Sequence, residues 1–248
     1  MKKIGFCFMI GLVLTMLMSI ASAAATIMEL SDNGIMIAQG LAFLAMGVGV
    51  TLYMRKRDRS MAAFGFGKWD IREDGKALYY LPLLVIALVQ PVMGGFDPKL
   101  TAAKILLVLV FSALVGYTEE AVFRGIMREK LRSRGAGFFI VFSSLFFGVL
   151  HMANALSGKD ALSTSLQIVN ALLIGFILAL LLELTGRIVP LILFHFLFDA
   201  LAQMTNPAIE SHEVLVVSVL NVIYLAYGLY LIYALRRGKA TPYTVTAA

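Results

Sequence analysis

Two adjacent glutamates lie in the middle of a long apolar segment, where charged side chains are rare. Glu119 and Glu120 interrupt the run LVFSALVGYTEEAVFRGIM, and Arg124 follows Glu120 by four residues. A charged residue inside hydrocarbon costs roughly 2.5–3.5 kcal/mol on insertion scales. A pair of carboxylates at this place therefore indicates that other groups neutralise it or that the protein uses it.

Two of the three histidines also lie in apolar segments. His151 is in FSSLFFGVLHMAN, and His195 is in IVPLILFHFLFDAL, where Asp199 follows it by four residues. Residues four apart share one face of a helix, so His195 and Asp199 should be neighbours. His212 lies outside these segments, beside Glu213, and carries no role in the prediction.

The spacing predicts different tasks for the two glutamates. Glu120 and Arg124 share a helix face and should form an ion pair. Glu119 is one position back, about 100° around the helix, so it can face a different partner. This arrangement would leave Glu119 free to act while Glu120 holds the segment in place.

A carboxylate and two imidazoles that meet in a water-accessible cavity permit two kinds of chemistry. They can deprotonate a water molecule and stabilise an oxyanion, which is general-base hydrolysis. Glu119, His151 and His195 could instead hold a divalent metal such as zinc, with one coordination position open for water. Each feature alone is more typical of a packing histidine or a structural ion pair. Their similar depth in three segments predicts a shared site, but the residues do not decide between the two chemistries.

The composition indicates a polytopic membrane protein. Of 248 residues, 60% are hydrophobic and 15% are charged, and the mean hydropathy is +0.88, whereas soluble chains carry about 25% charged residues. The net charge of +6 arises from cations in short loops rather than from a continuous basic surface. The composition therefore predicts the lipid bilayer as a partner, with no nucleic acid. The single cysteine, Cys7, excludes an intramolecular disulfide and a cysteine zinc site.

About eight apolar runs approach the roughly 20 residues that cross a bilayer. They lie near 4–25, 34–54, 78–96, 101–123, 137–155, 165–184, 188–205 and 214–235. We predict an all-α, polytopic transmembrane helical bundle of about eight spans, or seven if the first run is a cleaved signal.

The segments outside the central part have simpler interpretations. Residues 1–25 are either a signal sequence, ending in small residues after Lys2 and Lys3, or a first transmembrane helix. Residues 26–100 hold further transmembrane helices and an amphipathic segment, 55–76, which is either an interfacial element on the cytoplasmic face or a plain connector. Residues 206–248 form the last transmembrane helix and a tail.

The charged loops predict the orientation. If each run crosses the membrane once, the arginine-rich loops fall on one side, and that side should be cytoplasmic. These loops carry Arg55, Lys56, Arg57, Arg59, Arg128, Lys130, Arg132, Arg134, Arg187, Arg236, Arg237 and Lys239. The predicted location is the plasma (inner) membrane.

Three short motifs carry a resemblance to a known family. They are Glu119-Glu120-x-x-x-Arg124-Gly125, Phe147-x-x-x-His151 and His195-x-x-x-Asp199. Their order and spacing resemble the CPBP intramembrane proteases, a group that includes Rce1-type CAAX prenyl proteases and bacteriocin-immunity (Abi) proteins. The resemblance covers about residues 101–205, which would form the catalytic core of a helical membrane bundle with a cavity open to the membrane or the cytoplasm.

The resemblance implies a peptide or membrane-protein substrate and a role for each motif. Glu119 and His151 would activate the water, His195 and Asp199 would form the oxyanion side, and Glu120 and Arg124 would be supporting residues. The family was first regarded as metalloproteases, but water activated by the glutamate is the stronger interpretation. We therefore expect no cofactor, while a divalent metal such as zinc on Glu119, His151 and His195 remains an alternative.

One position departs from part of the family. Many members carry asparagine where this chain has Asp199, and an ionised carboxylate cannot donate a hydrogen bond to an oxyanion. Asp199 must then be protonated, orient His195 or bind a metal. A prenylated substrate is not expected, because the signal-like amino terminus and compact loops are typical of a bacterial chain. The alternatives to an intramembrane endopeptidase are a transporter or proton relay and a non-catalytic immunity or binding protein.

Overall fold

The computed structural model describes residues 2–67, 75–153 and 160–237, and their regular structure is helical. The long helices are α1 (Lys2–Ile27), α2 (Asp32–Arg57), α3 (Leu81–Gly94), α4 (Ala102–Glu120), α6 (Ala136–Leu150), α7 (Ala161–Thr185), α8 (Val189–Met204) and α9 (Glu213–Arg237). Shorter helical turns are η1 (Ala62–Phe64), η2 (Gly75–Tyr80), η3 (Ala121–Ile126), α5 (Met127–Leu131), η4 (Arg132–Arg134) and η6 (Pro207–His212).

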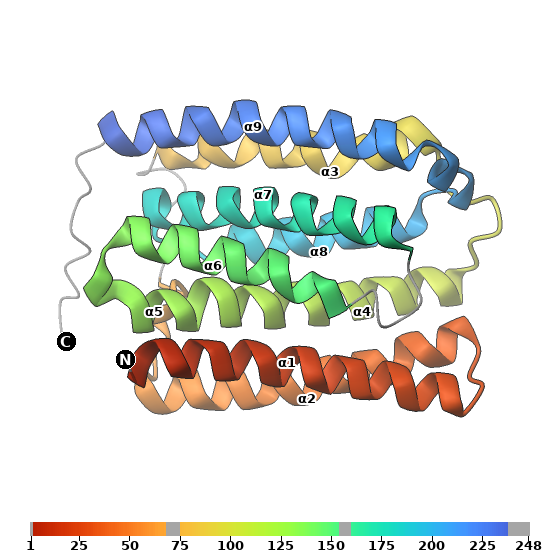
Figure 1. Cartoon of the computed structure of the whole chain (residues 1–248), viewed down its shortest axis with the longest axis horizontal. Coiled ribbons are helices and arrows are strands. Elements are labelled where there is room, and N and C mark those ends of the chain that lie inside the picture. Colours follow the sequence, from red (N-terminus) through yellow and green to blue (C-terminus); the bar gives the residue numbers. More distant parts are fainter. Residues whose placement is uncertain (1, 68–74, 154–159, 238–248) are drawn as a thin grey trace.

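The helices lie side by side along one direction and form a bundle (Figure 1). The neighbouring pairs include α1 with α2, α2 with α4, α4 with α8, α6 with α7, and α7 with α9. Seven helical stretches among the described residues are long and apolar enough to cross a membrane. The predicted all-α bundle of membrane-spanning helices is thus confirmed.

The predicted span at 188–205 is the shortest of the predicted set. It forms α8, a 16-residue apolar helix that is shorter than the stretches counted as spans. Pro190 lies in its first turn, where the missing N–H of proline costs no hydrogen bond. The helix ends at Met204, and Thr205 adopts an extended conformation.

The predicted span at 101–123 is longer in the structure and changes its winding. Thr101 caps α4 by accepting a hydrogen bond from the N–H of Lys104 at 3.2 Å. After Glu120 the chain continues as the π-helical turn η3 and then as α5. Each residue of η3 is buried. Such π-turns occur often at functional sites.

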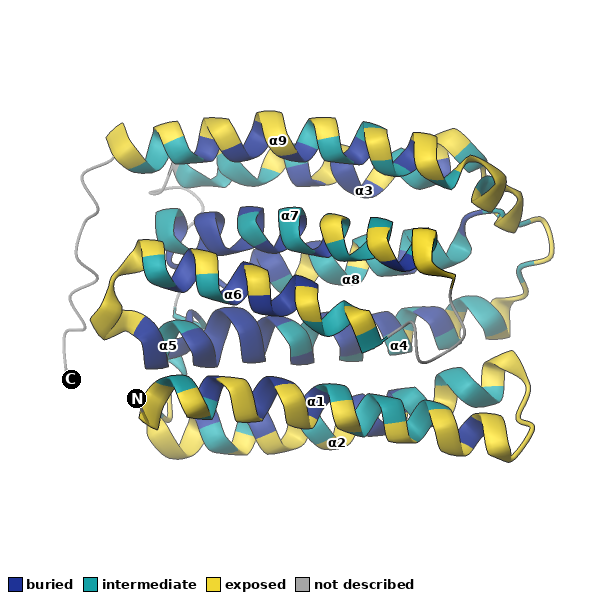
Figure 2. Cartoon of the chain, in the orientation of Figure 1, coloured by how far each residue is buried: buried dark blue, intermediate teal, exposed yellow. Residues whose placement is uncertain are grey.

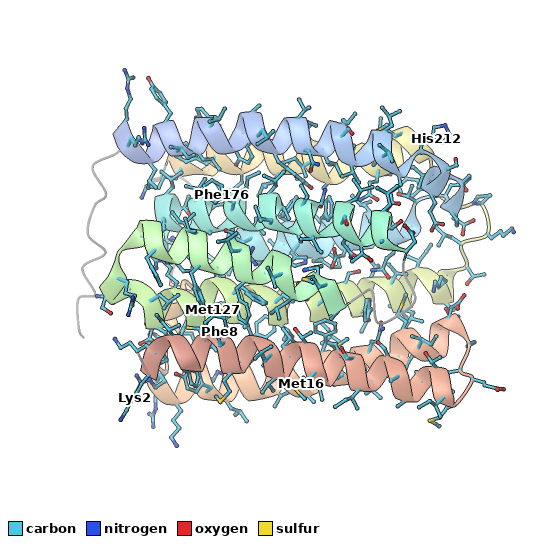
Figure 3. The ribbon with its side chains drawn as sticks, viewed as in Figure 1. Lys2, Phe8, Met16, Met127, Phe176 and His212 are labelled. Atoms are coloured by element: carbon cyan, nitrogen blue, oxygen red, sulfur yellow. The ribbon has the colours of Figure 1, made fainter. Side chains whose placement is uncertain are left out.

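The two ends of the bundle differ in their charged residues. The arginine-rich end contains the start of α1, the end of α2, the segment α5–η4 and the end of α9, with Lys2, Arg55, Lys56, Arg57, Arg128, Arg132, Arg134, Arg236 and Arg237. The opposite end contains the loop between α1 and α2 and the turn η6. Figure 3 shows Lys2 at the first end and His212 at the other. The structure therefore groups the basic loops as the sequence predicted.

The half of the bundle nearest the arginine-rich end is tightly packed. Buried positions concentrate there, whereas exposed and half-buried positions prevail toward the opposite end (Figure 2). Its apolar core includes Met54, Phe64, Ile126, Met127, Leu131, Leu182 and Ile188, none of them more than 1% exposed. The backbone also connects here, because the N–H of Ile188 donates to the carbonyl of Gly65 at 3.0 Å.

One side chain of segment 55–76 belongs to this packing. Phe64 is 1% exposed and packs against the core. The interpretation of the segment as an interfacial element or a connector stays a prediction. The rest of the amphipathic pattern, at 68–74, lies outside the described residues.

A close approach of two helices depends on Gly116 and provides a test of the packing. A Cβ atom on Gly116 in α4 would lie 2.9 Å from the backbone nitrogen of Phe196 in α8. We expect Gly116→Ala to lower the free energy of unfolding by about 1–3 kcal/mol, because backbone atoms cannot move aside easily. Thermal unfolding in detergent measures this effect. Gly49→Ala is the matched control, since a Cβ atom on Gly49 has no neighbour within 4 Å; equal loss in both variants would contradict the packing.

Candidate active site

Three helices bring the ionisable residues together near the middle of the bundle. Glu119 and Glu120 end α4, His151 follows the last residue of α6, and His195 and Asp199 lie one turn apart in α8. The close packing of α4 against α8, through Gly116, places the two glutamates beside His195. The convergence that the sequence predicted is present in the structure.

Glu120 and Arg124 form a fully buried ion pair. Arg124 Nη1 donates to Glu120 Oε1 at 3.0 Å, and both side chains are 0% exposed, so the predicted pair is confirmed. The guanidinium also lies over the ring of Phe147, 4.6 Å from its centroid. Gly175 of α7 leaves room for it, since a Cβ atom there would lie 3.1 Å from Arg124 Nη2. Arg124 thus connects α4, α6 and α7.

Glu120 has a second partner that the sequence did not reveal. Nδ1 of His195 lies 2.9 Å from Glu120 Oε1. A carboxylate paired with arginine only accepts hydrogen bonds, so this contact assigns the hydrogen to Nδ1. Glu120 therefore fixes both the tautomer and the orientation of His195. Its own side chain is fully buried and is not among the residues that line the cavity.

The other ring nitrogen of His195 faces the remaining two carboxylates. Nε2 lies 3.7 Å from Glu119 Oε2 and 3.5 Å from Asp199 Oδ2. The side chains of Glu119 and Asp199 are 17% and 26% exposed, in contrast with 0% for Glu120. The two adjacent glutamates therefore point to different environments, as their angular separation on the helix predicted.

His151 is oriented by its own helix. Nδ1 lies 2.8 Å from the carbonyl oxygen of Phe147, and because a carbonyl only accepts, Nδ1 carries the hydrogen. The Phe147 ring meets the rings of both histidines edge to face, with centroids 4.8 Å from His151 and 6.3 Å from His195. Nε2 of His151 in the neutral ring is then a lone-pair acceptor.

Glu119, His151 and Asp199 line one partly open cavity of about 410 Å³. Its other walls come from α1, α2, α4, η3, α6, the residues just after α6, and α7. They consist of Leu14, Thr15, Met18, Ser19, Ser22, Gln39, Phe43, Phe111, Val115, Phe123, Phe147, Leu150, Ala153 and Gln167. The contribution of α1 was not predicted, because residues 1–25 were interpreted only as a signal or a span. The hydroxyl residues Thr15, Ser19 and Ser22 within this apolar run are the sequence feature that could have indicated a polar wall.

The arrangement does not fit a metal site on the predicted ligands. Among the described residues, no group of three or more His, Cys, Asp or Glu side chains has a geometry that could hold a metal ion. His195 directs one nitrogen at Glu120 and the other between Glu119 and Asp199. The set Glu119, His151 and His195 is therefore not gathered into one coordination shell, and we derive no step through a metal.

Comparison with known proteins supports the resemblance carried by the three motifs. Residues 101–201 match the family model described as type II CAAX prenyl endopeptidase, Rce1-like. No curated protein and no solved structure matches the chain. The matched segment runs from the start of α4 into α8 and includes each of the predicted site residues. Over this segment the chain is similar to the Rce1-like family of endopeptidases, and its described residues include several helices apolar enough to cross a membrane.

Proposed function

We propose that this protein is an intramembrane endopeptidase that hydrolyses a peptide bond with a water molecule activated by Glu119 and His151. The observation that supports it best is the contrast between the glutamates. Glu120 is buried and bound to Arg124 and His195, whereas Glu119 faces the cavity beside His195 and Asp199. Such an arrangement supplies a base that is oriented by fixed neighbours.

In this mechanism the base side of the cavity consists of Glu119 and His151. Water between them donates one hydrogen to a Glu119 oxygen and another to Nε2 of His151. Glu119 then takes the proton as the water oxygen attacks the carbonyl carbon of the substrate. Proton transfer to a positioned side chain typically raises the rate of the reaction 10²–10⁴-fold.

The oxyanion side consists of His195 and Asp199. When His195 carries a proton on Nε2 as well as on Nδ1, Nε2–H can donate to the developing oxyanion. Asp199, 3.5 Å from Nε2, orients this nitrogen and leaves the donor role to His195. Of the three roles open to Asp199, orientation of His195 agrees best with this distance.

The reaction closes with collapse of the tetrahedral intermediate. The carbon–nitrogen bond breaks, and the proton held by Glu119 passes to the leaving nitrogen. The products are one new carboxyl group and one new amine, and the enzyme returns to its starting state. One oxygen of the new carboxyl group comes from water, and the other is the original carbonyl oxygen of the substrate.

The alternative functions are less consistent with the geometry. A transporter or proton relay needs a polar path to both ends of the bundle. Among the described residues, the half nearest the arginine-rich end is filled by apolar side chains around the buried Glu120–Arg124 pair. A non-catalytic binding protein does not require that Glu119 line the same cavity as the oriented His151 and lie beside the oriented His195.

Substitution of the water-activating pair tests the proposed function. We expect Glu119→Gln and His151→Ala each to lower cleavage by at least about 10²-fold, because each removes a proton acceptor. The measurement uses the purified protein, a pool of peptides from membrane proteins, and mass spectrometry of the products. Glu29→Gln in the exposed loop between α1 and α2 is the control. Unchanged cleavage by both variants, with the fold retained, would reject the catalytic assignment.

The supporting pair predicts an effect on stability. We expect Arg124→Met to lower the free energy of unfolding by about 3–5 kcal/mol, because it leaves the buried Glu120 carboxylate without its partner. The double variant Glu120→Met/Arg124→Met should recover part of this loss and remain inactive. Arg128→Met, which breaks a more exposed pair with Glu183, should cost less. Chemical unfolding in detergent measures all three, and an equal loss for Arg124→Met and Arg128→Met would contradict the role of burial.

The proposed mechanism also predicts resistance to chelators. We expect phenanthroline to leave cleavage within about twofold of the untreated enzyme, since the base and the oxyanion donor are protein groups. The measurement is peptide cleavage before and after chelation, followed by added zinc. Loss of cleavage that zinc restores would show instead that a metal takes part.

A further inference from the structure

The cavity is placed asymmetrically along the bundle. Its residues from α1 run from Leu14, at the middle of that helix, into the second half, and its residues from α2, Gln39 and Phe43, lie in the first half. His151 and Ala153 come at and after the end of α6, and Gln167 is near the start of α7. Because α1 and α6 begin at the arginine-rich end and α2 and α7 run in the opposite direction, these positions share the other half (Figure 1).

Helix rise gives the depth of the cavity. At 1.5 Å per residue, Ser22 lies about 30 Å along α1 from Lys2, and Gln39 lies about 27 Å along α2 from Arg57. By the same rise, Glu119 lies about 14 Å from Arg128. The cavity therefore has Glu119 near its floor and extends from there away from the arginine-rich end.

The arginine-rich half closes the floor of this cavity. The buried Glu120–Arg124 pair lies next to Glu119 in the chain, and beyond it come the buried residues Ile126, Met127 and Leu131. Figure 3 shows Met127 within this half. Close-packed apolar side chains leave no room for a polypeptide to pass. A peptide that reached Glu119 from the arginine-rich end would have to displace this core.

The open half has a wall suited to a polypeptide. Thr15, Ser19 and Ser22 of α1 line the cavity with Gln39 of α2, and Gln39 Nε2 donates to Ser22 Oγ at 2.8 Å. Hydroxyl and amide groups can bind the N–H and C=O groups of an extended chain, which must be satisfied away from water. Apolar residues of the same cavity, such as Met18 and Leu150, can contact the side chains of the substrate.

We propose that water and the substrate polypeptide reach Glu119 from the end of the bundle opposite the arginine clusters, along the polar face of α1. With arginine-rich loops in the cytoplasm, this is the extracytoplasmic side. The substrate class is then a polypeptide segment in the outer half of the membrane or just outside it, not a cytoplasmic carboxyl terminus. The substrate part of this inference rests on the proposed function; the direction of access does not.

Cysteine labelling in sided membrane vesicles tests the direction of access without any assay of cleavage. The parent is Cys7→Ala, which removes the single native thiol from a buried position outside the cavity. Single cysteines are then placed at Ser19 and Ser22. The probe is a small, membrane-impermeant methanethiosulfonate that carries a sulfonate, applied to right-side-out and to inside-out vesicles.

Three further single-cysteine variants calibrate the result. Ser211→Cys reports the exposed end that contains η6, and Ser133→Cys reports the arginine-rich end in η4. Ile20→Cys lies on α1 between the two test positions but is exposed outside the cavity, facing lipid. A thiol in hydrocarbon reacts poorly because it does not ionise there.

We expect Ser19→Cys and Ser22→Cys to react in the vesicles in which Ser211→Cys reacts, at least about tenfold faster than Ile20→Cys. Reaction in the vesicles that label Ser133→Cys would overturn the inference, and so would failure of both test positions to react. Labelling of Ser211→Cys from the cytoplasmic side would overturn the assignment of the open end to the extracytoplasmic face.

A second arm separates this inference from the proposed function. Peptides from membrane proteins are supplied on one side of sealed vesicles, and cleavage is expected only on the side that labels Ser211→Cys. Cleavage only on the other side would overturn the direction of substrate access. Absence of cleavage on both sides would count against the proposed function, while the labelling result would still decide how the cavity is reached.

Discussion

The buried ion pair between Glu120 and Arg124 is the interaction on which the rest of the site depends. Two charges without exposure to solvent are costly unless their geometry is close and further groups contact them. Here Arg124 meets the carboxylate at 3.0 Å and the Phe147 ring at 4.6 Å, and His195 contacts the same carboxylate oxygen. Removal of Glu120 would leave Arg124 without its ion-pair partner, and removal of Arg124 would leave Glu120 in contact with His195 alone. The pair therefore acts as the point at which α4, α6 and α8 are held in one arrangement.

From this point outward, each of the two histidines is oriented by a fixed neighbour. Glu120 directs His195, and the backbone of Phe147 directs His151. The π-helical turn that begins at Ala121 is buried throughout and directly follows the two glutamates. Its wider winding changes the direction of the residues beyond Glu120, so that Arg124 still reaches Glu120 while the chain continues into α5. The irregular turn and the buried pair thus lie together beside the two glutamates.

Local periodicity explains which parts could be predicted from the sequence. Spacing of four residues predicted the contacts Glu120–Arg124 and His195–Asp199, and both are present. Apolar run lengths predicted the helices. By contrast, the contact between Glu120 and His195 joins residues 75 positions apart, and no spacing rule connects them. The burial of Phe64 and the use of α1 as a cavity wall also depend on tertiary packing, which a single sequence does not show.

The asymmetry of the bundle follows from the same constraint. A fully desolvated ion pair needs a close-packed surrounding, and that surrounding occupies the half with the arginine-rich end. The role proposed for Glu119 needs water, so its side of the helix must face an opening, and the cavity that Glu119 lines provides one. Neighbouring residues on α4 thus mark the boundary between a dry half and a wet half. A boundary of this kind lets one membrane protein keep a buried ion pair and a cavity-lining carboxylate one residue apart, which is the arrangement that the proposed hydrolysis requires.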